Sequence, residues 1–428
     1  MADLSVEFSG IRLKNPLIVG AGPNTQNFQT SLDCMKAGFG GIVVRSLHRT
    51  HLDEHKESSR GFWRIYSANK NYKKSLYSFQ STGSPAQRVH KNIPPGFGGA
   101  AVMPTLEEYT EEVYKITRTA KDYDCTVIAS TGWCGARLSD EEVWTAEAKA
   151  MTEAGVDAIE LHTGPSPATE PGRFITIDPH KYLEMPIKAS KQASNLPIFP
   201  KIPADCCDTV GMSAFAQEAG ADGVVPVTRW ISIPIDIENE KEPVWRGPGI
   251  GGPWSAPIMT GFVFRMRHAD QPINYVNGSP TVGFPNSPPV TVPIIASGGG
   301  RSGADIIGYI MAGADAAQIC VQVILEGVGA GGRILKEMSD WMDRKGYKRV
   351  SDFQGTLKLV GAKDARSIPQ WQPVVDDNLC NACMICIESC YNNAISMVDN
   401  KARVDDSYCE GCRTCYYVCP KNAISLKE

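Results

Sequence analysis

Eight cysteines in the last 49 residues constrain the fold of this chain more than any other feature. They form two runs with the same spacing, C-x2-C-x2-C-x3-C. The first run is Cys380, Cys383, Cys386 and Cys390, and the second is Cys409, Cys412, Cys415 and Cys419. Cysteines this close together outside a secreted protein indicate metal ligands rather than disulfides. The chain begins with MADLSVEFSGIRLKNP, which lacks the basic and apolar regions of a secretory signal, so we expect a cytoplasmic protein.

The two runs belong to one repeated unit, CNACMICIESCYNNAISM and CEGCRTCYYVCPKNAISL. This tail resembles the bacterial two-cluster ferredoxins, in which the fourth cysteine of each run ligates the other cluster. The resemblance implies two [4Fe–4S] clusters, held by Cys380, Cys383, Cys386 and Cys419, and by Cys409, Cys412, Cys415 and Cys390. A structural zinc site is the alternative, although zinc ribbons use pairs of C-x2-C. Tyr391 stands where a proline is usual, a departure that removes no ligand.

Short apolar runs alternate with helical patterns before residue 330. Most of the runs are continuously apolar, as expected for parallel strands buried on both faces. Eight strand–helix units predict a closed (β/α)8 barrel, an α/β fold. A doubly wound open sheet is the alternative, but no early Gly-x-Gly-x-x-Gly follows a first strand. The predicted strands are Leu17–Gly20, Gly41–Arg45, Thr126–Ser130, Ala158–Leu161, Ile198–Lys201, Gly223–Val227, Pro293–Ser297 and Ala317–Val321.

We expect three segments: the barrel over 1–335, a last helix and linker over 336–373, and a ferredoxin domain over 374–428. Within the second segment the helix is expected at 336–355. We expect no repeat within the barrel. The net charge of −4 provides no basic field for nucleic acid, and no run of about 18 apolar residues predicts a membrane span.

Two connections are far longer than ordinary βα loops. One runs from Ser46 to about Pro104 and is rich in basic and aromatic residues, and the other runs from Arg229 to about Pro289 and is rich in glycine and proline. Both follow the carboxyl ends of predicted strands, where barrel active sites are assembled, so we interpret them as walls or lids. The charged stretch Arg60–Lys74 either grips an anionic substrate or forms a dimer contact.

Glycines at the end of the seventh predicted strand point to a phosphate. The segment IASGGG places Ser297, Gly299 and Gly300 where backbone N–H groups can reach one, and barrels often bind phosphate there. A plain tight turn is the alternative. Because one-electron clusters need a converter to drive two-electron organic chemistry, a flavin is expected.

The order of motifs resembles the flavin barrel of the dihydroorotate dehydrogenase family, and above all the pyrimidine-reducing half of dihydropyrimidine dehydrogenases. The shared segments include GIRLKNPLIVGAGP, AGVDAIEL, PIFPKI, AGADGVVPVT and PIIASGGGRSGAD. The resemblance implies FMN, with Lys201 beside the isoalloxazine ring. It also implies a group of further flavin-site residues: Gly20, Ala21, Gly22, Arg45, Ser46, Thr228, Gly252, Ser297, Gly299, Gly300 and Gln322.

The residues expected around the substrate differ from those that are usual in that family. Arg45 replaces a lysine, His162 lies where a substrate-binding asparagine is usual, and the stretch Ser166–Thr176 lacks the usual acid cysteine. His162 is our first candidate for a proton donor, because histidine titrates near neutral pH, although it equally fits a role in binding or packing. Cys134 is the second. Weaker candidates are His48, His51, Tyr66, Cys206 and Cys207.

These observations predict an oxidoreductase that reduces, or forms, a C=C bond conjugated to a carbonyl or cyclic amide. Electrons are expected to pass from a partner, through two [4Fe–4S] clusters, to FMN and then to a small unsaturated molecule. The partner is either an NAD(P)H-oxidising flavoprotein subunit or a ferredoxin, since the chain has no second dinucleotide fold. Two alternatives stay open: a uracil- or thymine-reducing subunit with an unusual acid, and a pure electron-transfer subunit. A homodimer or hetero-oligomer is expected.

Overall fold

The computed structural model describes residues 2–46, 63–66, 78–82, 106–132, 141–163, 180–204, 208–227, 230–231, 237–240, 249–269, 273–275, 279–281, 287–358 and 372–427. The chain divides into two compact units. The larger comprises Met1–Pro272 and Val282–Leu357, and the smaller comprises Ile273–Thr281 and Lys358–Glu428. The segment boundaries expected from the sequence stay predictions.

A parallel sheet of seven strands curls at the centre of the larger unit, in the order β14-β15-β3-β4-β7-β8-β9. Two isolated bridges, Lys201 to Val225 and Val224 to Ile294, join its two edges. The predicted barrel is therefore confirmed, although the sixth predicted strand contributes only these bridges. The seven strands are β3 (Leu17–Val19), β4 (Gly41–Val44), β7 (Thr126–Thr131), β8 (Ala158–His162), β9 (Ile198–Lys201), β14 (Ile295–Ser297) and β15 (Ala316–Ile319).

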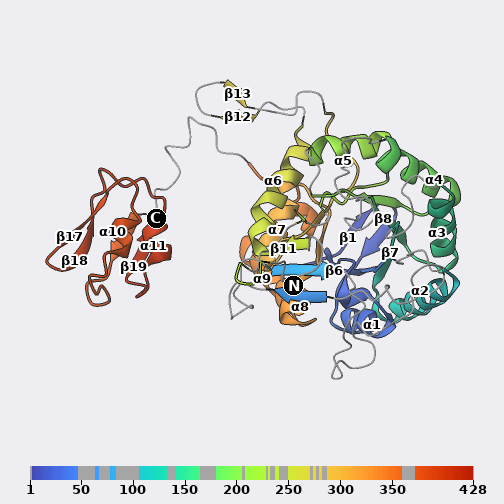
Figure 1. Ribbon diagram of the computed structural model, residues 1–428, viewed down its shortest axis with the longest axis horizontal. Helices are drawn as coiled ribbons and strands as arrows, with labels where there is room; N and C mark the ends of the chain where they lie inside the picture. Colours follow the sequence, from blue (N-terminus) through green and yellow to red (C-terminus); the bar gives the residue numbers. More distant parts are fainter. Residues whose placement is uncertain are drawn as a thin grey trace. The chain divides into compact units, whose positions relative to one another are not determined.

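Helices surround the strands in a ring (Figure 1). A π-turn, η5 (His180–Glu184), leads directly into α4. The helices are α1 (Phe28–Lys36), α2 (Leu106–Ala120), α3 (Glu141–Glu153), α4 (Met185–Ala193), α5 (Thr209–Glu218), α6 (Ala256–Arg267), α7 (Gly303–Ala312), α8 (Val321–Glu326) and α9 (Ala330–Lys345). The last helix, α9, begins and ends earlier than the predicted 336–355. It ends at Lys345 because Gly346 adopts a left-handed φ of 80°.

A short motif, Ala-Gly-x-Asp, turns the chain from helix to strand three times. Each glycine has a positive φ, 77° at Gly155, 98° at Gly220 and 114° at Gly313, which ends the preceding helix cheaply. The aspartate two residues later accepts a hydrogen bond from a backbone N–H within one residue of the start of the neighbouring strand. The distances are 2.7 Å from Asp157 to Val127, 2.9 Å from Asp222 to Ile198 and 2.8 Å from Asp315 to Ile294.

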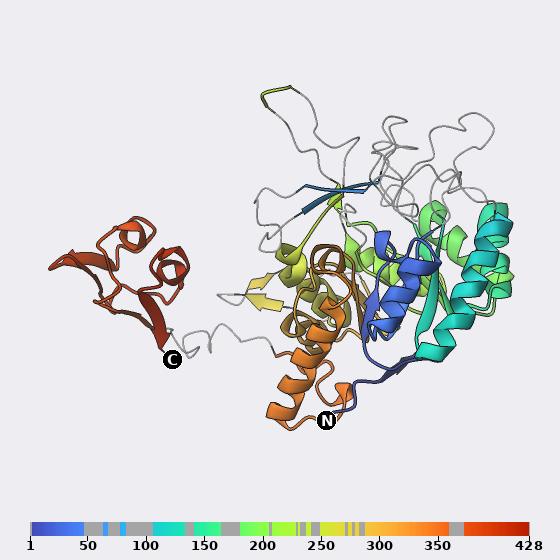
Figure 2. The ribbon, with the colours of Figure 1, turned by 90° about the horizontal axis from the view of Figure 1, so that it is seen from below.

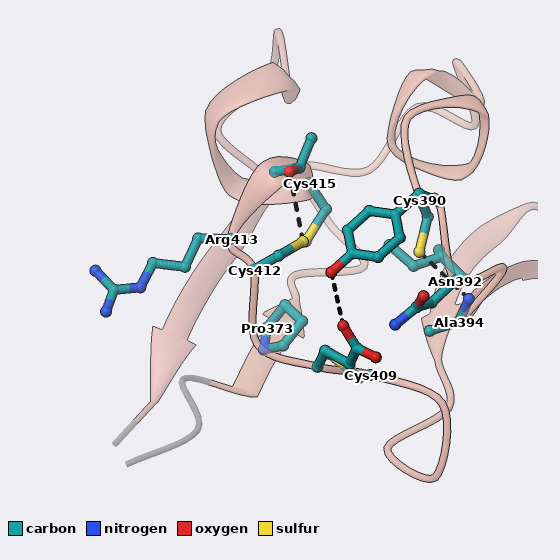
Figure 3. A pocket seen from close by; sticks show the side chains of 12 residues that line it. Pro373, Cys390, Asn392, Ala394, Cys409, Cys412, Arg413 and Cys415 are labelled. Atoms are coloured by element: carbon teal, nitrogen blue, oxygen red, sulfur yellow. Dashed lines mark hydrogen bonds between the residues drawn. The ribbon is translucent and has the colours of Figure 1, made fainter. Parts of the chain in front are cut away.

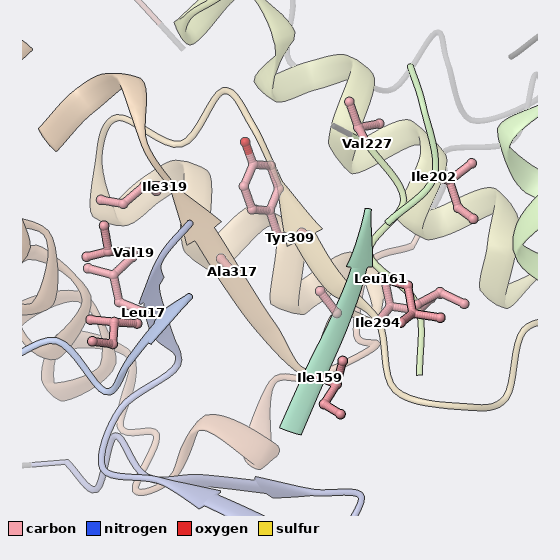
Figure 4. Packing of buried hydrophobic residues seen from close by; sticks show 14 of the residues in the cluster. Leu17, Val19, Ile159, Leu161, Ile202, Val227, Ile294, Tyr309, Ala317 and Ile319 are labelled. Atoms are coloured by element: carbon pink, nitrogen blue, oxygen red, sulfur yellow. The ribbon is translucent and has the colours of Figure 1, made fainter. Parts of the chain in front are cut away.

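Side chains from all eight strand positions fill the barrel interior. Strand residues alternate in direction, so one set points inward and the other toward the helices. The outward set, including Leu17, Val19 and Ile159, packs under the helices (Figure 4). The inward set is Ile18, Val43, Ile128, Ala158, Phe199, Val225, Ile295 and Ala316.

An N-terminal hairpin closes one end of this interior. Strands β1 (Val6–Phe8) and β2 (Ile11–Leu13) pair antiparallel. Phe8 packs edge-on against Phe199, with ring centroids 6.2 Å apart. Figure 2 shows the hairpin at the end of the barrel that carries the N-terminus. The other end, where the strands finish, is left for a site.

The two long connections contribute strands to one common sheet. Strands β5 (Trp63–Tyr66) and β6 (Ser78–Thr82) come from the first connection, and β10 (Trp230–Ile231) and β11 (Gly249–Gly251) come from the second. They pair in the order β10-β11-β6-β5. This sheet lies at the opposite end of the barrel from the N-terminal hairpin (Figure 2), and β11 leads directly toward the start of α6. The two connections are therefore hydrogen-bonded to each other through β6 and β11, and their role as walls or lids stays a prediction.

The smaller unit contains the cysteine-rich tail and the hairpin of β12 (Ile273–Tyr275) with β13 (Ser279–Thr281). In the tail, β16 (Gln372–Val375) pairs with β19 (Ile424–Lys427), and β17 (Ile395–Val398) pairs with β18 (Lys401–Val404). Two short helices, α10 (Ile385–Glu388) and α11 (Thr414–Val418), each contain the third cysteine of a run, Cys386 and Cys415. No helix among the described residues of either unit has both the length and the hydropathy that a membrane crossing requires.

Candidate functional site

A layer of polar side chains follows the apolar interior. Its members lie two residues further along their strands, toward the carboxyl ends. Lys201 ends β9 and is only 8% exposed. Its Nζ donates to Glu160 Oε1 at 3.1 Å and to Gln318 Oε1 at 2.7 Å. Gln318 Nε2 in turn donates to Glu160 Oε2 at 2.6 Å, which closes a ring of three side chains from three strands. A buried charge pair of this kind holds its cation in one place.

His162 lies beside this ring. It ends β8 and is paired in register with Lys201 on β9. Alternation along β8 directs its side chain to the same face as Glu160, into the barrel mouth. Thr163 follows and donates from Oγ1 to the Lys201 carbonyl at 3.0 Å. The structure therefore places His162 and Lys201 side by side on neighbouring strands, and the role of His162 as a proton donor stays a prediction.

The chain that leaves β3, the first strand of the barrel, packs closely against the end of β15. A Cβ added to Gly20 would lie 3.3 Å from Gln318 Oε1, and one added to Gly22 would lie 2.6 Å from Cys320 Sγ. Ala21 packs against the interior cluster. Burial raises the pKa of Cys320 to about 11, while Lys201 and Arg45 act in the opposite direction. Ser46 forms a hydrogen bond of 2.6 Å with Ser130, so the end of the second barrel strand also borders this mouth.

The glycine-rich turn after β14 packs against the start of α6. Gly298 and Gly299 have φ values of 95° and 79°. A Cβ on Gly299 would lie 2.3 Å from the backbone nitrogen of Ala256, the first residue of α6. Gly252, with φ of 152°, precedes that helix. Tyr309 anchors the turn by donating to the Gly298 carbonyl at 2.8 Å. Glycine backbone and a helix N-terminus thus meet where phosphate was predicted.

Gln322 has a partner of its own in this structure. It lies in α8 and its Nε2 donates to Glu326 Oε2 at 2.6 Å. The helix begins at Val321, which the sequence analysis placed in the eighth strand. A role for the Gln322 side chain at a phosphate stays a prediction. Ser297 is buried at the end of β14, and Gly300 packs against Ile319 and Ile306.

Several predicted residues lie outside the described part of the chain. They include Cys134 and Thr228, the weaker candidates His48, His51, Cys206 and Cys207, and the loop Ser166–Thr176. Of the charged stretch Arg60–Lys74, the structure describes the backbone of Trp63–Tyr66 as β5. The roles predicted for these residues stay predictions.

The sequence analysis overlooked Glu160 and Gln318 as members of the site. Both are 1% exposed, and each interrupts an apolar strand. A charged residue inside a strand that is buried on both faces requires a buried partner. The sequence of β8, AIELH, contains such a charged residue among apolar ones. Its Glu160 needs a buried cation, which Lys201 on the neighbouring strand supplies.

The cysteines of the tail surround two hollows. Cys380, Cys383 and Cys386 from the first run and Cys419 from the second line one, which we call the first hollow. Cys409, Cys412 and Cys415 with Cys390 line the other, which we call the second hollow (Figure 3). The crossed pattern expected from the ferredoxin resemblance is thus present in the arrangement of the thiols.

Backbone geometry repeats around the two hollows. Positive φ occurs at Ala382 and Gly411, at Met384 and Arg413, and at Asn393 and Asn422, each pair equivalent in the repeated unit. The fourth cysteine of each run accepts a backbone N–H, Ala394 to Cys390 Sγ and Ala423 to Cys419 Sγ, both at 3.3 Å. Backbone N–H groups of Ala402 and Ala382 lower the pKa of Cys380, which favours the thiolate that metals bind. Burial raises the pKa of Cys415 to about 11.

No three His, Cys, Asp or Glu side chains within the described residues converge closely enough to hold a single metal ion. The thiols instead stand apart on the walls of a hollow, which suits a cubane of several irons. Among the buried side-chain groups of the described residues that lack a hydrogen-bond partner are Thr131 Oγ1, at the end of β7, and Trp254 Nε1, just before α6.

Fold and site together define a (β/α)8 barrel with a polar mouth, joined to an iron–sulfur domain. Residues 379–423 match the family model for a 4Fe-4S dicluster domain. Over most of its length the chain is similar to dihydroorotate dehydrogenases. It is 25% identical over 359 residues to the catalytic subunit of dihydroorotate dehydrogenase B (NAD(+)) from Thermoplasma acidophilum, covering 83% of this chain and 99% of that protein.

Two further relatives give the same picture. The corresponding catalytic subunit from Methanocaldococcus jannaschii is 26% identical over 341 residues, covering 79% of this chain and 93% of the relative. Dihydroorotate dehydrogenase A (fumarate) from Limosilactobacillus reuteri is 24% identical over 351 residues, covering 82% and 96%. The matches span nearly the whole of each relative and leave part of this chain outside.

Proposed function

We propose that this chain is an iron–sulfur flavoprotein oxidoreductase that acts on a CH–CH group conjugated to a carbonyl or cyclic amide. The similarity to dihydroorotate dehydrogenases indicates a CH–CH oxidoreductase. The observation that carries the proposal is the combination in one chain of two four-cysteine hollows with a barrel mouth that presents Lys201 in a fixed position. Iron–sulfur clusters carry single electrons, so the barrel must supply the two-electron chemistry.

FMN fits the residues at the barrel mouth. The turn of Gly298 and Gly299 against the start of α6 offers N–H groups to a phosphate. Glycine at positions 20 and 22 leaves the end of β3 without side chains. The Lys201 ammonium can interact there with the electron-rich edge of a reduced flavin ring. Bound FMN would supply exchange between one-electron carriers and a two-electron reaction. We propose that Lys201 binds the ring and that His162 binds the substrate or delivers its proton.

Two [4Fe–4S] clusters are proposed for the two hollows, with the eight cysteines as ligands. The crossed arrangement of the thiols and the match to a dicluster model support this number. Electrons would enter from a partner, either a flavoprotein subunit that oxidises NAD(P)H or a ferredoxin. Two of the similar proteins are catalytic subunits by name, which is consistent with a separate electron-transfer subunit. The cytoplasmic location and a homodimer or hetero-oligomer stay predictions.

Reduction of a pyrimidine such as uracil or thymine is a second candidate for the reaction of this chain. One observation favours it over dihydroorotate oxidation: this chain carries its own iron–sulfur domain, while the matches to the dihydroorotate dehydrogenases already span nearly their whole length. A built-in electron carrier suits a chain that receives electrons from a partner to reduce its substrate.

An anaerobic experiment tests the function and separates the substrates. The purified, reconstituted protein is analysed for flavin, iron and sulfide, reduced with dithionite and freed of excess reductant. Flavin absorbance is then followed after addition of uracil, thymine or orotate. Return of the oxidised spectrum with one of these compounds supports CH–CH chemistry and identifies its class. A protein that binds no flavin would refute the proposal, and a loaded flavin that none of a panel of conjugated C=C compounds reoxidises would favour the pure electron-transfer alternative.

A further inference from the structure

Exposed tyrosines cluster around the second hollow. Tyr391, Tyr408, Tyr416 and Tyr417 are 65%, 65%, 42% and 74% exposed, and we call these four residues the tyrosine collar. Three of them are direct chain neighbours of cysteines that line the second hollow: Cys390, Cys409 and Cys415. Tyr417 lies against Tyr416, with ring centroids 5.1 Å apart. Large side chains left this exposed next to a redox centre need an explanation.

The fold of the tail does not require tyrosines at these positions. The two halves of the repeated unit share the same backbone turns, and the equivalents of the collar in the other half are Pro420, Leu379, Ile387 and Glu388. Proline is also the usual residue at the position of Tyr391. Since the other half folds in the same way without tyrosine, the collar serves something other than the fold.

Hydrogen bonds hold part of the collar in place. Tyr391 Oη donates to Glu410 Oε2 at 2.7 Å. Asn392 Nδ2 donates to the Tyr408 carbonyl at 3.3 Å, which ties the chain around Tyr391 to the chain around Tyr408. A collar that is already ordered loses less conformational entropy when a partner covers it.

The same end of the tail is acidic. The segments around the second hollow, 388–395 and 405–418, contain four carboxylates and one arginine. The carboxylates Glu388, Asp405, Asp406 and Glu410 are all exposed. The remaining segments of the tail, 372–387, 396–404 and 419–427, contain three carboxylates against four lysines or arginines. Negative charge and exposed aromatic surface therefore coincide at one hollow only.

We propose that the tyrosine collar is the docking surface for a one-electron carrier protein whose own redox centre is rimmed by positive charge. This inference rests on the proposed function, because it needs a cluster in the second hollow. Tyrosine is enriched in protein interfaces, where it buries a large rigid surface and keeps a polar end. Complementary charge speeds encounter and orients the partner, as suits a short-lived electron-transfer complex.

Electron transfer to cytochrome c, a lysine-rich haem protein, tests the inference on the full-length holoprotein. The protein is reduced anaerobically with stoichiometric dithionite, and haem reduction is followed by stopped flow at several salt concentrations. We compare Tyr408→Ser/Tyr417→Ser at the collar with Leu379→Ser/Met384→Ser at the first hollow. Leu379 is the repeat equivalent of Tyr408, and both control residues are 48% exposed. A third variant, Asp406→Lys, reverses the charge of one exposed carboxylate and leaves the four tyrosines in place.

The collar variant is expected to lower the second-order rate constant about ten-fold at low salt, as loss of interface anchors does, while the control variant stays within about two-fold. Asp406→Lys is expected to lower the rate constant and weaken its salt dependence. Equal rate constants for the collar variant and the parent would overturn the inference. So would a loss of oligomeric state in the collar variant by gel filtration, since a second copy would then be the occupant.

Iron and sulfide analysis before each measurement separates the two proposals. A protein without iron would refute the proposed clusters, and the docking inference with them. Fully loaded clusters with unchanged rate constants would refute the docking inference alone.

Discussion

At the scale of single residues, the ring of Glu160, Lys201 and Gln318 is the most consequential arrangement in the barrel. Its three members come from β8, β9 and β15, so no local sequence pattern joins them. Each is nearly inaccessible to water, and the two charges are tolerated because they satisfy each other. The ring fixes the lysine that we propose for the flavin.

Removing one charge of the ring should destabilise the barrel. Lys201→Met leaves Glu160 buried and unpaired, and loss of one partner of a buried pair costs about 3–5 kcal/mol. Urea unfolding measures the free energy of unfolding, and the double variant Lys201→Met/Glu160→Gln should recover part of the loss. Lys336→Met, which breaks the exposed pair of Lys336 with Asp340, should leave the unfolding midpoint nearly unchanged. If Lys201→Met lowered the free energy of unfolding no more than Lys336→Met does, the buried pair would not contribute to stability.

Cys320 gives a test of the electrostatics at the barrel mouth. Burial disfavours its thiolate and raises the pKa to about 11, so the thiol is protonated at pH 8. Alkylation by iodoacetamide should therefore be about a hundred-fold slower than for a free cysteine of pKa near 8.5. The rate should rise about ten-fold per pH unit between pH 8 and 10, since the thiolate fraction does so below the pKa. Mass spectrometry of the Cys320 peptide measures this, and rapid alkylation at pH 8 would mean that Lys201 and Arg45 outweigh burial.

At the scale of elements, the glycine turn and α6 form one unit. The turn fits only because Gly299 has no side chain, and Ala-Gly-x-Asp motifs hold the other ends of the strands in register. The backbone of the turn at Gly299 lies directly against the backbone of Ala256 in α6. A side chain added to the turn must therefore displace the start of the helix.

Two glycine substitutions should have opposite effects. Gly299→Ala places a Cβ against Ala256 and demands a left-handed φ, so we expect a loss of about 1–3 kcal/mol of stability and weaker FMN binding. Gly332→Ala lies on the exposed face of α9, where a Cβ meets nothing within 4 Å, and should gain about 0.5–1 kcal/mol from helix propensity. Thermal unfolding and flavin fluorescence titration measure both. Full FMN affinity in Gly299→Ala would contradict the proposed phosphate site.

At the scale of the whole molecule, the two units differ in what holds them together. The barrel unit has an extensive apolar interior, while the tail core contains only Cys386, Ile395, Ala402, Cys415 and Ile424 as buried hydrophobic residues within its described cluster. So small a core rarely supports a domain without a metal or disulfides. The proposed clusters would therefore carry the fold of the tail.

Removal of iron should unfold the tail and spare the barrel. After oxidation and chelation, limited proteolysis is expected to cleave within 372–427, while the barrel fragment resists. The iron-loaded protein treated in parallel provides the control. Persistent protection of the iron-free tail would show that its small core is sufficient and that the clusters serve electron transfer alone.

The features that depend on local chemistry could be predicted from the amino-acid sequence. The cysteine spacing indicated iron–sulfur ligation, the buried apolar runs predicted parallel strands, and IASGGG marked the turn that packs on α6. The pairing of other distant parts became visible only once the chain was folded: Glu160 meets Lys201, and β6 pairs with β11. The reason is physical. Backbone preferences and hydrophobic periodicity act over a few residues, whereas a buried charge or an unpaired strand edge is satisfied by whatever the closed barrel brings beside it.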